Sequence, residues 1–412
     1  MKTAQPLHSA LLQPFPVENN CLTVGGIPLT RLAQRVGRTP FYVYDRQLIR
    51  RRVDLLRQHL PHDLHLHYAM KANPMPVVVQ HLAQLVDGID VASVGEMKVA
   101  LDTGISPQNI SFAGPGKGSQ ELACAIAAGI VLNVESEHEL TTIIELADQM
   151  HLRPKIALRV NPDFELKSSG MKMGGGAKQF GIDAENVPAI LTRIASNNLD
   201  FEGLHIFSGS QNLKAEAIHE SHQKTLQLAV QLVSASPVVV RTINIGGGLG
   251  IPYFPGEQPL DLALIGNNLK KLLAEVSPAL PGVQFVMELG RYLVGEAGIY
   301  VCKILDKKLS RGQIFLVTDG GLHHHLAASG NFGQVIRKNY PVAIGNRMNV
   351  TETETVSVVG PLCTPLDLLA DRMMLAKAEP GDLVVVFQSG AYGLTASPTA
   401  FLGHPAPLEI LV

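Results

Sequence analysis

The sequence is poor in the features that mark disulfide-stapled, zinc-stabilised or membrane-spanning chains. Only four of its 412 residues are cysteine, and they show no CxxC spacing, so neither a disulfide framework nor a structural zinc site is expected. No run of about 18 apolar residues occurs, which argues against a membrane-spanning helix. The N-terminal stretch MKTAQPLHSALLQPFPVENN is broken by prolines and lacks the apolar core of a signal peptide. Together these absences predict a cytoplasmic enzyme whose cysteines are thiols.

An excess of charge of either sign is also missing. The chain has 34 Lys and Arg residues against 36 Asp and Glu residues, so bulk electrostatics predicts no nucleic-acid partner and no membrane surface. Hydrophobic residues make up 46% of the chain, which is ample material for a core. A length of 412 residues exceeds one ordinary core and predicts two domains.

Short β-rich runs alternate with longer segments of helical periodicity over the first 290 residues. The eight runs are residues 64–69, 89–93, 110–113, 130–134, 155–160, 202–206, 240–245 and 284–289. Eight strand–helix units predict a parallel (β/α)8 TIM barrel. After about Arg291 short β-rich pieces separated by turns predict a second, mostly β domain. We expect a barrel over 44–292, a β-sandwich or barrel-like domain over 293–412, and an N-terminal β segment, 1–43, that joins the latter.

Polar residues gather at the carboxyl ends of the expected barrel strands, where barrel enzymes carry their chemistry. Lys71, in HYAMKANP, follows the first strand and is a candidate to lose its proton in an apolar setting and form a Schiff base. The other strand ends contribute Asp90, Glu135, Arg159, Asn161, His205 and Glu288. Because these ends meet at one mouth of a barrel, the placement predicts a site there.

Two elements at this mouth indicate a binding site for an anion. Gly246, Gly247 and Gly248 let the backbone approach a ligand and aim N–H groups at phosphate oxygens, and Ser210 and Arg291 can add contacts. A Schiff-base lysine, a phosphate cradle and the carboxylate of Glu288 together indicate pyridoxal phosphate. The carboxylate would hydrogen-bond the pyridine nitrogen and keep it protonated.

The sequence resembles the fold-type III pyridoxal-phosphate decarboxylases, which include diaminopimelate, ornithine and arginine decarboxylases. The resemblance covers about residues 24–412. It is carried by HYAMKANP, DVASVGE, FAGPGK, NVES, RVNP, KQFG, GSQ, IGGG, ELGRYLV, VVGPLC and GAYG. It implies the two-domain architecture of the alanine-racemase type and a homodimer with shared active sites.

By position, the resemblance implies a role for each matching residue. Lys71 would be the Schiff-base lysine and Glu288 the partner of the pyridine nitrogen. Cys363, acting from the neighbouring subunit, would return a proton to Cα after carbon dioxide leaves. The cofactor contacts would come from Asp90, Arg159, His205, Phe207, Ser210, Gly246, Gly247, Gly248, Gly290, Arg291 and Tyr392, and Arg291 and Tyr392 would also face the substrate.

Three departures from the family pattern bear on the substrate. Phe207 stands where the family has a histidine that stacks on the pyridine ring, which retains an aromatic face but no titratable one. Thr364 replaces the acidic residue that follows the cysteine and holds a distal amine, and Ala327 occupies the approximate place of an arginine that grips a distal carboxylate. The distal charges of diaminopimelate, ornithine or lysine would lack partners.

The expected substrate is therefore an amino acid with a neutral or masked distal end. Relatives that decarboxylate a glutamyl group on an acyl-carrier protein have this character, and the chain also looks like decarboxylases associated with bacterial exosortase clusters. Diaminopimelate decarboxylation and amino-acid racemisation stay open as alternatives, as do a cofactor-free aldolase and a non-catalytic pyridoxal-phosphate carrier. The glycine-rich segment 168–181 is either a mobile lid or carrier dock, or a plain surface loop.

The run of His323, His324 and His325 invites a metal assignment. In an extended chain consecutive side chains point to alternating sides, so the three would not converge on one ion and no metal is expected. His323 and His324 are instead candidates, with Thr364, to contact the distal end of the substrate.

Overall fold

The computed structural model describes residues 14–164, 171–172, 174–332, 334 and 337–412 of the chain. Contacts divide these residues into two units. Unit 1 comprises residues up to Arg51, a short piece from Pro252 to Gln258, and everything from Leu293 onward, whereas unit 2 comprises Arg52–Ile251 and Pro259–Tyr292. The piece at Pro252 belongs with unit 1 because its carbonyl accepts a hydrogen bond from Gln388 Nε2 (3.1 Å).

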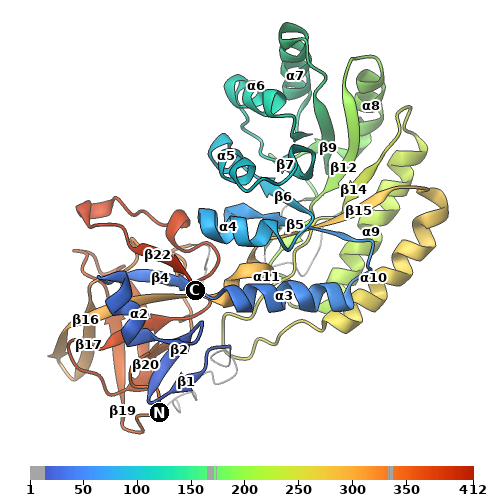
Figure 1. Ribbon diagram of the computed structural model, residues 1–412. Coiled ribbons are helices and arrows are strands. Elements are labelled where there is room, and N and C mark those ends of the chain that lie inside the picture. Colours follow the sequence, from blue (N-terminus) through green and yellow to red (C-terminus); the bar gives the residue numbers. More distant parts are fainter. Residues whose placement is uncertain (1–13, 165–170, 173, 333, 335–336) are drawn as a thin grey trace. The chain divides into compact units, whose positions relative to one another are not determined.

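Unit 2 is a closed barrel of eight parallel strands, as the sequence predicts (Figure 1). The strands run in the cyclic order β5, β6, β7, β8, β9, β12, β14 and β15, and β15 pairs with β5 to close the ring. Their bounds are β5 His65–Ala69, β6 Gly88–Val91, β7 Ile110–Phe112, β8 Val131–Val134, β9 Lys155–Asn161, β12 Asp200–Ile206, β14 Thr242–Asn244 and β15 Gln284–Leu289. Strands such as β9, KIALRVN, are buried on both faces, which is typical of parallel sheets covered by helices.

Helices connect the barrel strands and lie on the outside of the ring (Figure 1). The connecting helices are α4 Pro76–Ala83, α5 Val94–Asp102, α6 Ser119–Ala128, α7 Glu137–Met150, α8 Val187–Ala195, α9 Ala215–Ser234 and α10 Leu262–Val276. Helix α3 Arg46–His59 precedes β5, and α11 Arg291–Val294 follows β15. Ser93 Oγ accepts the amide of Glu96 at the start of α5, and Ser136 Oγ accepts the amide of Glu139 at the start of α7. These caps begin both helices directly after a strand, so the strand ends are held at a fixed place.

Unit 1 is built on an eight-stranded mixed sheet. Its strands are β4 Phe41–Tyr44, β16 Gly298–Ser310, β17 Gln313–Thr318, β18 Val342–Ile344, β19 Thr353–Val359, β20 Leu368–Ala376, β21 Leu383–Val386 and β22 Leu408–Leu411. A small sheet of β1 Val17–Glu18, β2 Cys21–Val24 and β3 Ile27–Pro28, with helix α2 Leu29–Val36, completes the unit. β4 pairs with both β16 and β22, which brings the N-terminal segment into the C-terminal sheet.

The core of unit 1 lies where these N-terminal and C-terminal segments meet. Leu22 of β2, Leu29 of α2 and Phe41 of β4 pack in one buried cluster with Val301 of β16 and Phe387. Burial of Leu22, Leu29 and Phe41 at roughly 1.5–3 kcal/mol each helps to hold residues 14–44 in this unit.

Candidate active site

Three charged or polar side chains meet at the carboxyl ends of the barrel strands. Lys71 lies in a short 3-10 helix, Met70–Ala72, directly after β5, and its Nζ is 3.7 Å from Oε1 of Glu288. His205, near the end of β12, places its Nε2 3.0 Å from the other carboxylate oxygen of Glu288. β5 is the hydrogen-bonded neighbour of β15, which explains how residues far apart in the sequence come together.

The carboxylate of Glu288 is buried and held in its charged form. Burial by itself raises the pKa of this carboxyl group, but the hydrogen bond with His205 and the positive charges of Lys71 and Arg159 outweigh it and lower the pKa to about 2. The side chain is only 6% exposed. A permanent anion at this place is what a protonated pyridine nitrogen requires as a partner.

Lys71 differs from the sequence prediction in one respect. The prediction assumed an apolar, desolvating setting, whereas the side chain is 45% exposed and its ammonium group is paired with Glu288. The ring of Phe207 lies 5.9 Å from Nζ, so an aromatic face is present beside the amine, as predicted from the sequence. The mouth of the barrel is therefore polar and open around Lys71.

A layer of hydrogen-bonded polar groups lies inside the barrel, and sequence reasoning found only part of it. Asp90 of β6 binds His67 Nδ1 (3.0 Å) and accepts from Ser111 Oγ (2.6 Å), which in turn accepts from Asn133 Nδ2 (3.1 Å). Burial lowers the pKa of His67, but Asp90 more than compensates, and the net shift is upward. A cavity of about 240 Å³ lies beside His67, Asn133 and His205.

Asp90 was predicted, but His67 and Ser111 were missed. The alternation of side chains along β5 could have indicated His67. It stands two residues before Ala69, so the two side chains lie on the same side of the strand. His67 is also the register partner of Glu288 across the β5–β15 pair.

The glycines at 246–248 form a tight turn after β14. Gly246 has a φ of +72° and donates its amide to Asn244 Oδ1 (2.8 Å). A Cβ on Gly247 would lie 1.8 Å from the carbonyl oxygen of Glu288, and one on Gly248 would lie 2.6 Å from that of Gly209. Only glycine fits at these two positions. Within the part of the chain that the structure describes, the amides of Gly247 and Gly248 donate no hydrogen bond, which suits a phosphate cradle.

The other predicted phosphate contacts come from neighbouring strand ends. Ser210 lies on the two-residue strand β13, Gly209–Ser210, which pairs with β10, Met171–Lys172. Gly290 packs against Ala72 of the Lys71 turn, and Arg291 begins α11 directly after it. Ser210 and Arg291 thus lie shortly after the strand ends that carry His205 and Glu288, and their contact with phosphate stays a prediction.

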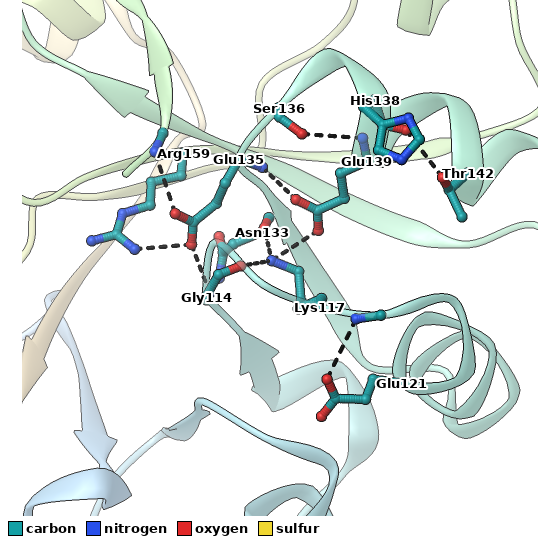
Figure 2. A network of polar contacts seen from close by, with 12 residues as sticks. Gly114, Lys117, Glu121, Asn133, Glu135, Ser136, His138, Glu139, Thr142 and Arg159 are labelled. Carbon is teal, nitrogen blue, oxygen red and sulfur yellow. Dashed lines mark hydrogen bonds and ion pairs between the residues drawn. The ribbon is translucent and has the colours of Figure 1, made fainter. Parts of the chain in front are cut away.

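A chain of buried charges lines one side of this rim (Figure 2). Glu135, just after β8, pairs with Arg159 Nη1 of β9 at 2.9 Å and accepts the amide of Gly114 (2.6 Å). Lys117 Nζ lies 2.8 Å from Glu139 Oε1, and Glu139 Oε2 accepts the amide of Glu135 (2.9 Å). Sequence reasoning named Arg159 and Glu135 but missed Lys117 and Glu139, whose contacts depend on how the loop after β7 folds.

In unit 1, Cys363 is exposed in a turn between β19 and β20, with Thr364 beside it. The turn is held by Asp367, whose carboxylate accepts the amides of Leu362 (2.8 Å) and Leu322 (2.6 Å). Burial raises the pKa of Asp367, and these hydrogen bonds oppose the shift. One carboxylate thus joins the cysteine turn to the segment that precedes His323.

Tyr392 lies in a left-handed backbone conformation, with a φ of +52°. A bulky residue in this region is uncommon and costs about 1–3 kcal/mol, which the surrounding packing must offset. Its neighbour Gly393 packs on the ring of Tyr42, where a Cβ would lie 2.7 Å from the ring carbon Cε1. The predicted role of Tyr392 as a cofactor and substrate contact stays a prediction.

The three consecutive histidines lie in a turn, not in an extended chain, because the amides of His324 and His325 both bind the carbonyl of Gly321. The premise of the sequence argument on these residues was therefore wrong. All three are buried, and burial lowers the pKa values of His323 and His325 to about 3 and that of His324 to about 4. His324 binds Pro405 O, and His325 binds Ser389 Oγ.

These contacts give the histidines a packing role in unit 1, and the predicted contact of His323 and His324 with substrate stays a prediction. Over residues 14–164 and the later described stretches, no group of three or more His, Cys, Asp or Glu side chains has an arrangement suited to a metal ion. None of the helices described has the length and apolar character that crossing a membrane requires.

Comparison with known proteins agrees with this site. Residues 46–295 match the family model described as the pyridoxal-binding domain of pyridoxal-dependent decarboxylases. The chain is 39% identical over 389 residues to an L-glutamyl-[BtrI acyl-carrier protein] decarboxylase of Niallia circulans, covering 93% of this chain and 90% of that one. It is 33% identical over 397 residues to a diaminopimelate decarboxylase of Aquifex aeolicus, covering 95% and 90%.

Among solved structures, diaminopimelate decarboxylase of Helicobacter pylori complexed with L-lysine superposes with a TM-score of 0.81 at 27% identity, covering 93% of this chain and 94% of that one. The fold, the lysine and carboxylate at the barrel mouth, the glycine cradle and these matches agree. The chain belongs to the pyridoxal-dependent decarboxylases, and it is a carboxy-lyase that acts on amino acids with pyridoxal phosphate as its cofactor.

Proposed function

We propose that this enzyme removes the α-carboxylate from an amino acid whose distal end is neutral or masked, and that a glutamyl group on an acyl-carrier protein is such a substrate. The main observation is that Thr364 follows Cys363, so the turn offers a hydroxyl where a free distal amine would need a carboxylate. Ala327, buried in the turn after the histidines, likewise offers no charge to a distal carboxylate. The relative from Niallia circulans, named for a carrier-bound glutamyl substrate, supports this choice.

The residues at the barrel mouth have complementary tasks in this proposal. Lys71 supplies the amine that holds the cofactor as a Schiff base, and the amides of Gly247 and Gly248 bind its phosphate. Glu288, kept anionic by His205, holds the proton on the pyridine nitrogen. When bound, pyridoxal phosphate supplies the electron sink for the pair of electrons left at Cα as carbon dioxide departs.

The proton that replaces the carboxylate comes from Cys363. The thiol is exposed in its own chain, which fits donation into the active site of a neighbouring subunit. A homodimer with shared sites and a cytoplasmic location remain part of the proposal.

A carbon-dioxide release assay tests the substrate. We would compare an acyl-carrier protein loaded with L-glutamate against free L-glutamate, diaminopimelate, L-ornithine and L-lysine. Release from the loaded carrier at a kcat/KM at least 100-fold above that of any free amino acid is expected. Turnover of free diaminopimelate at an ordinary enzymatic rate would contradict the proposal and favour diaminopimelate decarboxylation, and inversion at Cα without carbon dioxide would indicate a racemase.

A further inference from the structure

Four buried charges on one side of the barrel mouth form two ion pairs, Lys117–Glu139 and Glu135–Arg159, and the backbone amide of Glu135 links the pairs by donating to Glu139 Oε2 (Figure 2). We call these four residues the rim network. The side chains of Lys117 and Glu135 are only 1% exposed, and those of Glu139 and Arg159 are 8% and 9% exposed. Two positive and two negative groups balance, so the network carries no net charge.

Lys117 joins the rim network to the backbone around it through its ammonium group. Lys117 Nζ donates to the carbonyls of Gly114 (2.6 Å) and Asn133 (2.9 Å) and pairs with Glu139. The ammonium group of Lys117 therefore has three polar partners, two carbonyl oxygens and one carboxylate. Lys117 thereby ties the loop after β7 to the end of β8 and the start of α7.

Stability alone does not account for such an arrangement. Removing ions from water costs a large part of what their attraction returns, and well-packed apolar residues of similar volume are often as stable. Buried networks of this kind instead fix one geometry.

The network ends on two groups at the active site. The guanidinium of Arg159 lies over the ring of Phe180, 4.9 Å from its centroid, and Glu135 Oε2 accepts the amide of Gly181 (3.3 Å). Asn161, next along β9, accepts the amide of Gly175 (3.1 Å). The segment 174–181, the described end of the glycine-rich segment, is thus fastened at both ends to the rim. Residues 165–170 and 173 lie outside the described residues.

The same segment reaches the cofactor-binding strands. A Cβ on Gly174 would lie 3.2 Å from the carbonyl oxygen of Phe207, so this part of the segment packs directly against the residue whose ring faces Lys71. The charge of Arg159 also contributes to the low pKa of Glu288. Arg159 and the segment 174–181 therefore border the reacting groups from one side.

We propose that Lys117 and Glu139 are positioning residues of this decarboxylase: they fix Glu135, and Glu135 fixes both Arg159 and the segment 174–181 at the rim of the cofactor site. Neither Lys117 nor Glu139 touches the reacting atoms. Their effect passes through Glu135, whose carboxylate binds Arg159 on one side and the amide of Gly181 on the other.

The test removes one charge at a time and then both. Lys117→Met keeps the length of the side chain and deletes the ammonium group, Glu139→Gln keeps the shape and deletes the carboxylate, and a double variant restores the balance of charge. Lys98→Met on α5 and Glu145→Gln on α7 are matched controls, because both side chains are exposed on barrel helices.

Three measurements on purified protein do not depend on the identity of the substrate. They are the rate of chymotrypsin cleavage after Phe180, followed by mass spectrometry, the dissociation constant of pyridoxal phosphate from the apoprotein, and the circular dichroism of the bound cofactor. We expect Lys117→Met to speed cleavage after Phe180 and to weaken cofactor binding by at least tenfold each, with a changed dichroic band. The controls should stay within twofold, and Lys117→Arg should recover most of the loss.

The double variant keeps the test decisive if Lys117→Met folds poorly. It should remain folded yet show the same loosened segment and altered dichroic band, since Glu135 has lost its support. Cleavage and cofactor binding within twofold of the controls in the double variant, with only a lower unfolding temperature, would show a purely structural role and overturn the proposal. Failure of the carrier-bound substrate to react would leave these readouts unaffected.

Discussion

Substitution of Gly247 by alanine tests the phosphate cradle most directly. An added Cβ would lie 1.8 Å from the carbonyl oxygen of Glu288, whereas real Cβ contacts are essentially never under 3.0 Å. The turn after β14 must therefore shift by 3.0 − 1.8 = 1.2 Å or more. A shift of this size carries the amide of Gly247 or Gly248 out of hydrogen-bonding range of any anion that it faces.

The substitution should weaken the binding of the phosphate. A hydrogen bond to a charged group contributes roughly 1.5–3 kcal/mol, so loss of one such bond corresponds to about a 10- to 150-fold weaker affinity. Crowding in the turn should cost about 1–3 kcal/mol of stability as well. Gly116→Ala is the control, because Gly116 lies in an exposed turn with nothing within 4 Å of the new Cβ.

The assay is a titration of the apoprotein with pyridoxal phosphate and, separately, with pyridoxal, which lacks the phosphate. Gly247→Ala should weaken the binding of pyridoxal phosphate by about 10- to 150-fold and that of pyridoxal much less. Unchanged affinity for pyridoxal phosphate, within threefold of the control, would refute the cradle. Equal loss for both ligands would place the damage elsewhere, at Glu288.

Three further outcomes are expected. Lys71→Ala should abolish the absorbance band of the bound cofactor and turnover together, and full activity in this variant would contradict the assignment. Cys363→Ala should lose decarboxylation specificity, measured by product analysis, far more than cofactor affinity, measured by titration. Burial lowers the pKa of His222 on α9 to about 4, with His219 adding to the shift, so the unfolded chain takes up a proton that the folded one resists as pH falls from about 6.5 to 4. Between pH 7 and pH 5 the free energy of unfolding should therefore fall by about 2 kcal/mol less in the His222→Gln variant than in the unmodified protein, as measured by urea unfolding. The same fall in both proteins would contradict this reasoning.

The sequence was sufficient to predict the barrel and the placement of Lys71 and Glu288 at its mouth, because these depend on local patterns. Each strand is a short apolar run, Glu288 stands near the end of its strand, and Lys71 and the glycines 246–248 follow shortly after theirs. Closure of the barrel then brings these ends together by geometry alone.

The groups that the sequence did not predict depend on contacts between loops. Lys117 meets Glu139 only because the loop after β7 turns back over the end of β8, and no periodicity encodes that turn. The predicted conformation of the histidine run was wrong for a similar reason. Hydrogen bonds from the amides of His324 and His325 to the carbonyl of Gly321 form a turn, whereas the sequence argument assumed an extended chain. The sequence analysis also underestimated the polarity around Lys71. Its ion-pair partner Glu288 lies on the last strand of the barrel, far from Lys71 in the sequence.

The shared carboxylate of Asp367 has a consequence for redesign of substrate choice. It accepts amides from both Leu322 and Leu362, and a Cβ on either Gly321 or Gly360 would lie within 2.3 Å of its oxygens. The side chain of Asp367 therefore holds the segment with the three histidines and the turn with Cys363 against each other. If the proposed function holds, an acidic residue introduced at Thr364 alone would stand in a turn shaped by the histidine segment, and conversion to a free diamino acid decarboxylase would require grafting both segments from one donor enzyme.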